Sequence, residues 1–354
     1  MQITFEKLPD VLTNNNVKRI FVVGSKRAAE PVIEQLEKYN KEHTLFSAFQ
    51  VNPTYDDIVT GVHLFNNKNC DFIISIGGGS TIDTAKCIKL FSSLDSKKSF
   101  LEQEYKQNNI KHLCIPTTAG TGSEATSFSV IYYKGEKQSI KHDSKIPDYI
   151  ILEPELLKTL GDYQKKATLL DALCQSIESF WSVNSTTESK TFAEKSIKLV
   201  LDNIPSYFAG EDNALKNMLA AANYSGKAIN ITTTTAPHAM SYKLTSLYGI
   251  AHGHAVALCL PYVWEYMIKN STKEHKSFGE LNSLFNTEKS IESVKKFRDI
   301  LSSFDLPKPI MRNENELEIL VNSVNTDRLK NTPVSLDKKA IREIYQNIFN
   351  GRVS

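Results

Sequence analysis

The chain lacks several features that mark special classes of protein. Its five cysteines are an odd number and contain no Cys-x-x-Cys pair, which argues against a disulfide framework and a thiolate zinc site. No apolar run approaches the roughly 18–20 residues that a membrane-spanning helix needs. The N-terminus also has no basic-then-apolar signal pattern. We therefore expect a cytoplasmic protein with reduced, buried thiols and no membrane partner.

An excess of charge of one sign is missing as well. Lysine and arginine number 42 and aspartate and glutamate 40, for a formal net charge of +2. This balance gives no reason to expect a nucleic acid partner. With 41% hydrophobic and 23% charged residues, the composition is that of an ordinary globular protein. The 354 residues are enough for two domains of usual size.

The first part of the chain alternates short apolar runs with amphipathic stretches. Residues 20–23 and 70–76 are apolar runs that each lead into glycines and then into a helical pattern. Strands of this kind, joined through helices, predict a parallel sheet covered on both faces. An apolar run over 147–154, closed by proline, is expected to be the last strand. We assign residues 1–157 to an α/β dinucleotide-binding domain.

The second part has longer segments with helical periodicity. We expect helices there and assign residues 158–354 to an all-α domain. The clearest segments are residues 167–181, 193–204, 214–229, 290–304 and 338–349.

Two glycine-containing loops follow predicted strands. Gly77, Gly78, Gly79 and Ser80 precede a helix, so the backbone can turn tightly and the helix start can hold a phosphate. Ser80 is expected to be the N-cap, with Asp83 completing a capping-box-like pattern. The alternative is a tight turn without a ligand. A second loop, residues 116–126, is rich in small hydroxylated residues. Because ligands bind outside the carboxyl ends of strands, two such loops favour a nucleotide.

The helical part contains candidate metal ligands. Asp171 and Gln175 are four residues apart on one helix face, and His238 and His252 follow later in the chain. Two imidazoles, a carboxylate and an amide oxygen suit iron or zinc. The alternative is a solvated helix face and two structural histidines.

Taken together, these motifs resemble the iron-containing (group III) alcohol dehydrogenase family of the dehydroquinate synthase-like superfamily. The resemblance covers Gly77–Lys86, the loop at 116–126, and the ordered aspartate and histidines. It implies an N-terminal Rossmann-like domain, a C-terminal helical domain, a nicotinamide cofactor and a divalent metal, Fe or Zn. Asp171, His238 and His252 match metal ligands. The residues that the resemblance places at the cofactor are Ser25, Asn52, Gly78, Gly79, Ser80, Asp83, Thr117, Thr118, Thr126 and Lys137.

The chain departs from that family at three positions. Gln175 stands in place of a histidine ligand, and Tyr242 replaces a second histidine four residues after His238. An amide oxygen is a poorer donor than imidazole, but we still expect a bound metal. Ser25, followed by Lys26 and Arg27, replaces an aspartate that would bind a ribose 2′-hydroxyl. Two cations favour a 2′-phosphate, so NADP(H) is predicted over NAD(H), unless these charges are merely solvated.

The predicted reaction is hydride transfer between the cofactor and a small aldehyde or alcohol, with the metal as Lewis acid. Tyr242 or His254 would relay a proton, although His254 is equally well explained as structural.

Residues 232–258 resemble a narrower group, the phosphonoacetaldehyde reductases of phosphonate biosynthesis, which yield 2-hydroxyethylphosphonate. Lys243, Arg328 and Asn331 would then bind the phosphonate. The alternatives are a general small-alcohol dehydrogenase and a metal-free nucleotide-binding relative without activity. A homodimer is expected.

Overall fold

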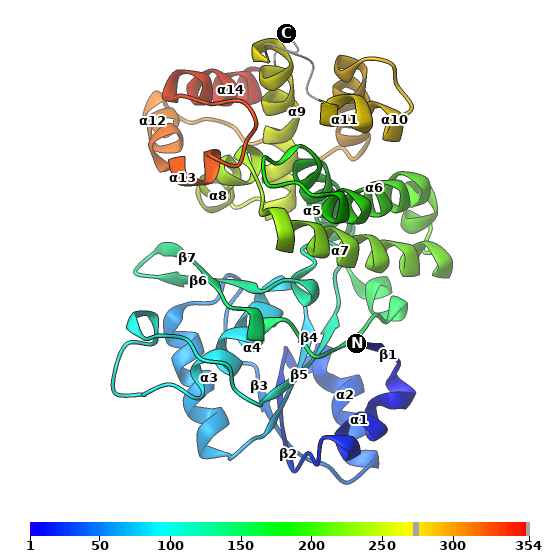
Figure 1. The fold of residues 1–354 in the computed structure, drawn as a ribbon, viewed down its shortest axis with the longest axis vertical. Coiled ribbons are helices and arrows are strands. Elements are labelled where there is room, and N and C mark those ends of the chain that lie inside the picture. Colours follow the sequence, from blue (N-terminus) through cyan, green and yellow to red (C-terminus); the bar gives the residue numbers. More distant parts are fainter. Residues whose placement is uncertain (272–275, 352–354) are drawn as a thin grey trace. The chain divides into compact units, whose positions relative to one another are not determined.

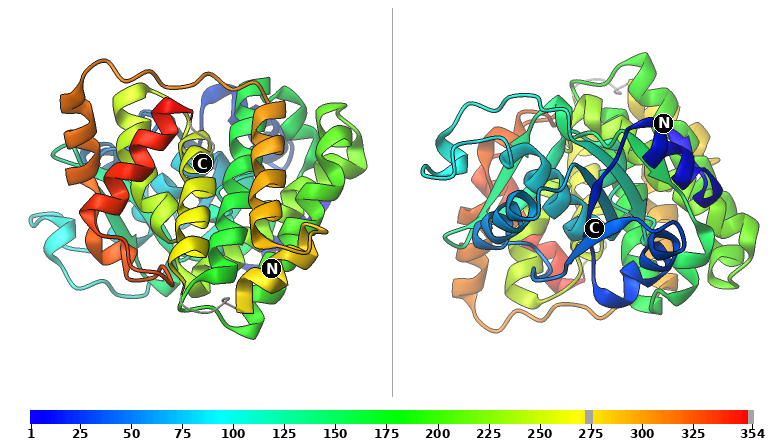
Figure 2. Two further views of the ribbon diagram at one scale, coloured as in Figure 1. Left: turned by 90° about the horizontal axis from the view of Figure 1, so that it is seen from above. Right: turned by 90° about the horizontal axis from the view of Figure 1, so that it is seen from below.

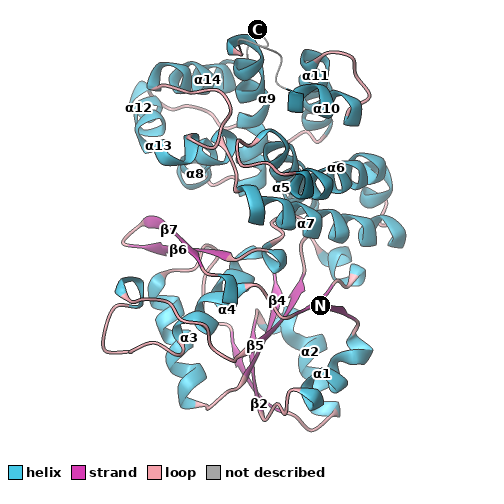
Figure 3. Ribbon diagram, viewed as in Figure 1, coloured by secondary structure: helices cyan, strands magenta, loops and turns pink. Residues whose placement is uncertain are grey.

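The computed structural model describes residues 1–271 and 276–351. The chain divides into two compact units, Met1–Leu160 and Gly161–Ser354 (Figure 1). Figure 3 shows the strands confined to unit 1 and helices forming the described part of unit 2. The predicted fold class, α/β followed by all-α, is confirmed. No helix in the described ranges is long and apolar enough to cross a membrane.

Unit 1 is built on a six-stranded parallel sheet. Its order is β1 (Gln2–Ile3), β8 (Tyr149–Ile151), β5 (Lys111–Pro116), β4 (Phe72–Gly77), β2 (Arg19–Val23) and β3 (Glu42–Phe46). Successive side chains of a strand point to opposite faces, and here both faces are buried. Phe21 and Val23 pack into one hydrophobic cluster, while Ile20 and Val22 pack into the other.

Four helices supply the cover for these two faces. One cluster takes side chains from α1 (Leu8–Asn14) and α2 (Lys26–Lys38), and the other from α3 (Tyr55–Asn67) and α4 (Gly79–Phe91). The view from below in Figure 2 shows helices on both sides of the strands. Covering both faces explains why the strands read as continuous apolar runs in the sequence.

A two-stranded antiparallel hairpin, β6 (Phe128–Tyr133) and β7 (Glu136–Lys141), extends unit 1 beyond the predicted elements. Its turn residues, Lys134 and Gly135, both have positive φ, as a tight hairpin turn requires. The N–H of Tyr132 donates to the carbonyl of Pro53, which ties the hairpin to the loop before α3.

Unit 2 is built around α5 (Asp162–Trp181). This helix packs against α6 (Thr187–Phe208), α7 (Asp212–Thr232) and α9 (His252–Asn270). The buried rings of Trp181 and Trp264 meet edge to face, with centroids 5.4 Å apart. The remaining helices are α8 (Ala236–Tyr248), α10 (Lys276–Leu284), α11 (Ser290–Ser303), α12 (Glu314–Ser323), α13 (Thr326–Leu329) and α14 (Lys338–Asn350).

The boundaries of some elements differ from the predictions. The predicted helix at 167–181 begins earlier, at Asp162. The prediction missed the first turn because its residues are mostly polar and show no apolar periodicity. The predicted strand at 147–154 is confined to Tyr149–Ile151, since Pro154 opens a 3-10 helix. The prediction that Ser80 caps α4 is wrong: the helix starts at Gly79, and Gly78 is the N-cap.

Candidate active site

Two loops meet at the carboxyl ends of β4 and β5. These strands pair so that Gly77 lies opposite Pro116, and the N–H of Thr117 donates to the carbonyl of Gly77 over 3.0 Å. A side chain at Gly79 would collide with the second loop, because a Cβ there would lie 2.9 Å from Cγ2 of Thr121. The glycines therefore permit the close approach of the two loops.

The start of α4 contacts further predicted cofactor residues. A Cβ at Gly78 would lie 3.3 Å from Cγ2 of Thr118, so these two residues are neighbours. Oγ of Ser80 accepts a hydrogen bond from the N–H of Asn52 over 3.2 Å. The first turn of a helix presents N–H groups and the positive end of the helix dipole, which suits a phosphate. One edge of the sheet thus gathers Asn52, Gly78, Gly79, Ser80, Thr117 and Thr118.

Asp83 and Thr126 belong to a buried network that holds the second loop. The carboxylate of Asp83 accepts hydrogen bonds from Oγ of Ser123 (2.6 Å) and from the N–H of Val130 (2.8 Å). Nζ of Lys86 donates to Oγ of Ser123 and to Oγ1 of Thr126, each over 3.0 Å. Burial lowers the pKa of Lys86 to about 8. Sequence reasoning missed Lys86, although a lysine among apolar residues one turn after Asp83 is a usable signal.

Ser25 lies at the end of β2, next to β4 in the sheet. It is the N-cap of α2, and its Oγ accepts a hydrogen bond from the N–H of Ala28 over 3.2 Å. Lys26 and Arg27 form the exposed start of that helix, whose first turn contains no acidic residue.

Lys137 lies on β7, opposite Tyr132 in the hairpin register. Because the N–H of Tyr132 donates to Pro53 over 2.8 Å, this pair lies beside the loop that carries Asn52. The hairpin therefore brings Lys137 to the neighbourhood of the predicted cofactor loops.

Unit 2 brings Asp171, His238 and His252 together. They come from α5, α8 and α9, and their ligand atoms all lie within 4.8 Å of one another. Nε2 of His238 is 3.5 Å and Nε2 of His252 is 4.0 Å from Oδ1 of Asp171. This approach depends on Gly253, where a Cβ would lie 2.0 Å from the carbonyl oxygen of Ala167. We call these three residues the metal group.

Glu178, which the sequence analysis missed, orients His238. It is fully buried, and one carboxylate oxygen is hydrogen-bonded to Nδ1 of His238. The other oxygen accepts hydrogen bonds from the N–H (2.6 Å) and Oγ1 (2.8 Å) of Thr235. Burial would lower the pKa of His238, but the carboxylates of Glu178 and Asp171 raise it to about 9. Glu178 follows Asp171 by two helical turns, which was the available signal.

The metal group fits a divalent transition metal. With Nδ1 of His238 bound to Glu178, its Nε2 is buried and forms no hydrogen bond within the described ranges. It lies 3.5 Å from Oδ1 of Asp171, so an imidazole nitrogen and a carboxylate oxygen converge on one point, where a metal ion would take the place of the proton on Nε2. Imidazole and carboxylate are ligands for zinc and iron, and a carboxylate behind a ligating histidine is the usual support.

Gln175 lies one turn after Asp171, as predicted, but its amide is engaged. Nε2 donates to Oδ2 of Asp171 over 3.3 Å, and Oε1 accepts a hydrogen bond from Oγ of Ser225 over 3.0 Å. The oxygen expected at the metal is within hydrogen-bond distance of the Ser225 hydroxyl. In this arrangement Gln175 supports Asp171 through its nitrogen.

Tyr242 joins Arg328 to the metal group. Its ring stacks on the imidazole of His252, with centroids 5.6 Å apart and an angle of 11° between the planes. NH1 of Arg328 donates to Oη of Tyr242 over 2.8 Å, and the guanidinium also lies over the ring. Burial raises the pKa of Tyr242, although the Arg328 charge opposes this shift.

The other residues predicted to act on the substrate lie in different surroundings. His254 is fully buried, its Nδ1 is 3.2 Å from Oη of Tyr163, and burial lowers its pKa to about 4. Lys243 is half-buried on α8, next to Tyr242 in the chain. Asn331 is buried, and its amide is hydrogen-bonded to two other segments of unit 2, residues 182–184 and 232–234. His254 and Asn331 therefore hold elements of unit 2 together.

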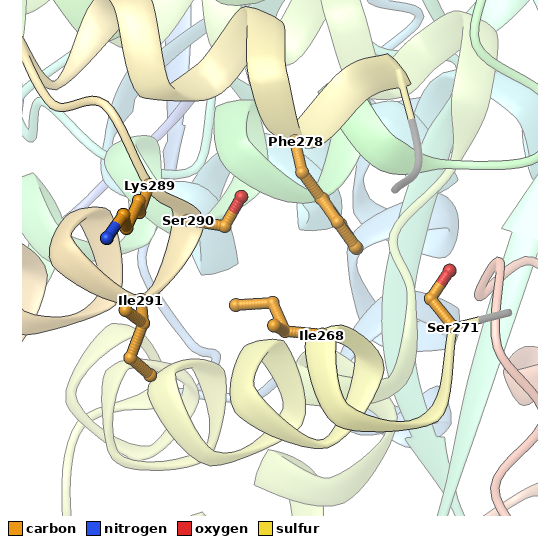
Figure 4. A pocket seen from close by; sticks show the side chains of 6 residues that line it. All are labelled: Ile268, Ser271, Phe278, Lys289, Ser290 and Ile291. Carbon is orange, nitrogen blue, oxygen red and sulfur yellow. The ribbon is translucent and has the colours of Figure 1, made fainter. Parts of the chain in front are cut away.

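A separate hollow lies elsewhere in unit 2 (Figure 4). It is found toward the end of α9, whereas His252 begins that helix. It contains none of the residues predicted for the site. The hollow is lined by Ile268, Ser271, Phe278, Lys289, Ser290 and Ile291.

Both units match models of one protein family. Residues 2–154 match iron-containing alcohol dehydrogenase, and residues 165–349 match the C-terminal part of the Fe-containing alcohol dehydrogenase family. A choline dehydrogenase from Bacillus subtilis is 30% identical over 349 residues, which covers 91% of this chain and 84% of the relative. Long-chain-alcohol dehydrogenase 1 from Geobacillus thermodenitrificans is 30% identical over 300 residues, with 80% and 76% covered. A crystal structure of an iron containing alcohol dehydrogenase has a TM-score of 0.86 and 27% identity, with 99% and 98% covered.

Proposed function

This chain belongs to the iron-containing alcohol dehydrogenase family and is an NAD(P)-dependent alcohol dehydrogenase, and we propose that it reduces a small aldehyde that carries an anionic group. The specific candidate is phosphonoacetaldehyde, with 2-hydroxyethylphosphonate as product. The observation that carries this proposal is the stack of Arg328 on Tyr242 and of Tyr242 on His252. It supports recognition of an anion beside the metal group.

The metal group and its neighbouring residues have different roles in unit 2. Asp171, His238 and His252 would hold the divalent ion, and Glu178 fixes the ring orientation of His238. A metal bound there would polarise the carbonyl oxygen, and a bound nicotinamide would supply the hydride. Tyr242 donates the proton that the product oxygen needs. A phenol is protonated at neutral pH, and burial raises the pKa of Tyr242 further from that range.

Arg328 gives the substrate preference in this proposal. A guanidinium carries five N–H donors in a planar fork, which matches the oxygens of a phosphonate. One donor is hydrogen-bonded to Tyr242. Lys243 on the neighbouring helix α8 adds a second positive charge. The amide of Asn331 is instead hydrogen-bonded within unit 2.

The cofactor loops of unit 1 support binding of the pyrophosphate at the start of α4. Lys26 and Arg27 at the exposed start of α2, with no acidic residue in that turn, support a preference for NADPH over NADH. A 2′-phosphate bound there would be attracted by two positive charges, and no acidic residue in that turn would repel it.

A kinetic panel tests the proposal. NADPH oxidation is followed with phosphonoacetaldehyde, propanal and butanal, on protein reconstituted with Fe(II) or Zn(II). We expect the highest kcat/KM with phosphonoacetaldehyde. Equal or better turnover of propanal or butanal would favour a general small-alcohol dehydrogenase instead. Light scattering on the same preparation checks the expected homodimer.

A further inference from the structure

Thr233 has a strained backbone in the turn between α7 and α8. Its φ is 59° and its ψ is 179°, a conformation that glycine adopts readily and a β-branched residue rarely does. Such a conformation persists only where surrounding contacts enforce it. The residues that hydrogen-bond to this turn therefore show which part of the structure the Thr233 conformation supports.

Asn331 supplies the hydrogen bonds that reach this turn from a distant segment, while the N–H of Thr233 also donates to the carbonyl of Ile229 over 2.8 Å. Nδ2 of Asn331 donates to the carbonyl oxygens of Thr232 (2.7 Å) and Thr234 (3.1 Å) and to Oγ1 of Thr233 (3.0 Å). Its Oδ1 accepts hydrogen bonds from Oγ of Ser182 (2.7 Å) and Nδ2 of Asn184 (2.8 Å). One buried amide thus ties the strained turn to the segment that follows α5.

The same turn leads directly to the metal group. Thr235 follows it, is the N-cap of α8 and donates two hydrogen bonds to Glu178, which holds His238. The N–H of Ala236 donates to Oγ1 of Thr332, the residue after Asn331. The turn and the first residue of α8 are therefore both anchored to residues 331–332.

We propose that Asn331 is a positioning residue of the metal centre: it holds Thr233 in its strained conformation, so that Glu178 and His238 keep the geometry that binds the ion. This inference rests on the metal site of the proposed function. It replaces the substrate contact expected for Asn331 with a structural link to the metal. Because Arg328 lies three residues earlier in the same segment, the anchor also holds the arginine that faces Tyr242.

A double-mutant cycle tests the proposal. Zn(II) affinity is measured by competition with a chromophoric chelator, using metal-free wild type, Asn331→Ala, Thr233→Gly and the double variant. Loss of support to a ligating histidine typically costs about 10–100-fold in metal affinity, and we expect about tenfold for Asn331→Ala. Thr233→Gly keeps wild-type affinity, because glycine adopts this backbone without strain. In the Thr233→Gly background the loss from Asn331→Ala shrinks to about threefold or less, since the turn no longer needs enforcing.

Two substitutions at the exposed position 233 test the proposal even if Asn331→Ala does not fold. Valine keeps the branched side chain and the strain but loses the hydrogen bond to Asn331. We therefore expect Thr233→Val to lower metal affinity and Thr233→Gly to preserve it. Equal affinity of both variants and wild type would overturn the proposal.

Asn282→Ala is the matched control. Asn282 is a buried amide on α10 that is hydrogen-bonded to Ser293, and we expect its loss to lower Tm without changing Zn(II) affinity. The same pattern for Asn331→Ala, a lower Tm with unchanged affinity, would also overturn the proposal. A wild-type protein that binds no metal would instead contradict the proposed function.

Discussion

The ring of Tyr242 lies nearly parallel to the imidazole of His252, with centroids 5.6 Å apart. Tyr242 stands one helical turn after His238, where the resemblance to the iron-containing alcohol dehydrogenases led us to expect a second histidine. Compared with a histidine, a tyrosine keeps an aromatic ring against His252 but exchanges a group that titrates near neutral pH for a phenol. It also provides the hydroxyl that Arg328 binds.

Removing that hydroxyl tests its role as proton donor. We expect Tyr242→Phe to lower kcat by about 10²-fold, the lower end of the usual contribution of a general acid, and to leave the Kd of NADPH unchanged. Stopped-flow turnover and fluorescence titration measure the two quantities. Tyr266→Phe removes a hydroxyl that is bonded only to the carbonyl of Ser335 among described partners, and it serves as control. An unchanged kcat in Tyr242→Phe would exclude the role.

Replacing Glu178 tests the support of His238. Glu178→Gln keeps the shape but removes the negative charge behind the imidazole. We expect Zn(II) affinity to fall by about 10–100-fold, measured by chelator competition. Glu265→Gln removes a buried carboxylate that pairs with Arg298 away from the metal group. This control should lose stability and keep its metal affinity; identical metal affinity in the two variants would refute the assignment.

Arg328 should discriminate between aldehydes. Because a hydrogen bond to a charged group contributes about 1.5–3 kcal/mol, Arg328→Ala should lower kcat/KM for phosphonoacetaldehyde by about 10–100-fold. The value for propanal should change far less. Arg312→Ala removes another arginine that lies over a tyrosine, Tyr248, and should affect neither substrate. An equal loss of kcat/KM for both aldehydes would show that Arg328 supports the site but does not bind the anionic group of the substrate.

The start of α2 should set the cofactor preference. Replacing Lys26 and Arg27 together with glutamate puts two negative charges where the 2′-phosphate is expected. We expect kcat/KM for NADPH to drop by about tenfold or more while the NADH value holds or rises. Lys38→Glu at the far end of α2 is the charge control. A wild type that already prefers NADH would contradict the proposal outright.

Lys86 should make stability depend on alkaline pH. Burial depresses its pKa to about 8 in the folded state from 10.5, so between these values the unfolded chain binds more protons. The contribution of Lys86 to the free energy of unfolding therefore rises with pH above about 8, by at most about 1.4 kcal/mol per unit. Denaturant unfolding of wild type and Lys86→Met from about pH 8 to about pH 9.5 measures the difference. A constant difference across that range would show that Lys86 is charged as readily as in water.

The sequence predicted those parts of the site that depend on local pattern. Apolar runs followed by glycines located β4 and the start of α4, because a tight turn needs glycine wherever the protein folds it. Helical spacing placed Asp171 and Gln175 on one face of an amphipathic helix, which the structure shows to be buried along most of its length. The order of motifs was enough to group Asp171 with His238 and His252, which the structure brings within ligand distance of one another.

Other residues were missed or assigned differently because their partners lie far along the chain. Glu178 meets Thr235 and His238, 57 and 60 residues later, and Asn331 meets Thr232, 99 residues earlier. A buried polar group is satisfied by whichever partner the packing brings to it, and no local pattern encodes that partner. By itself, the sequence determined the fold class, and it predicted a phosphate-binding turn and the types of metal ligand. Only the tertiary structure brought Ser225 beside Gln175, Glu178 beside His238 and Asn331 beside the turn at Thr233, because buried hydrogen bonds between distant segments exist only once the helices have packed.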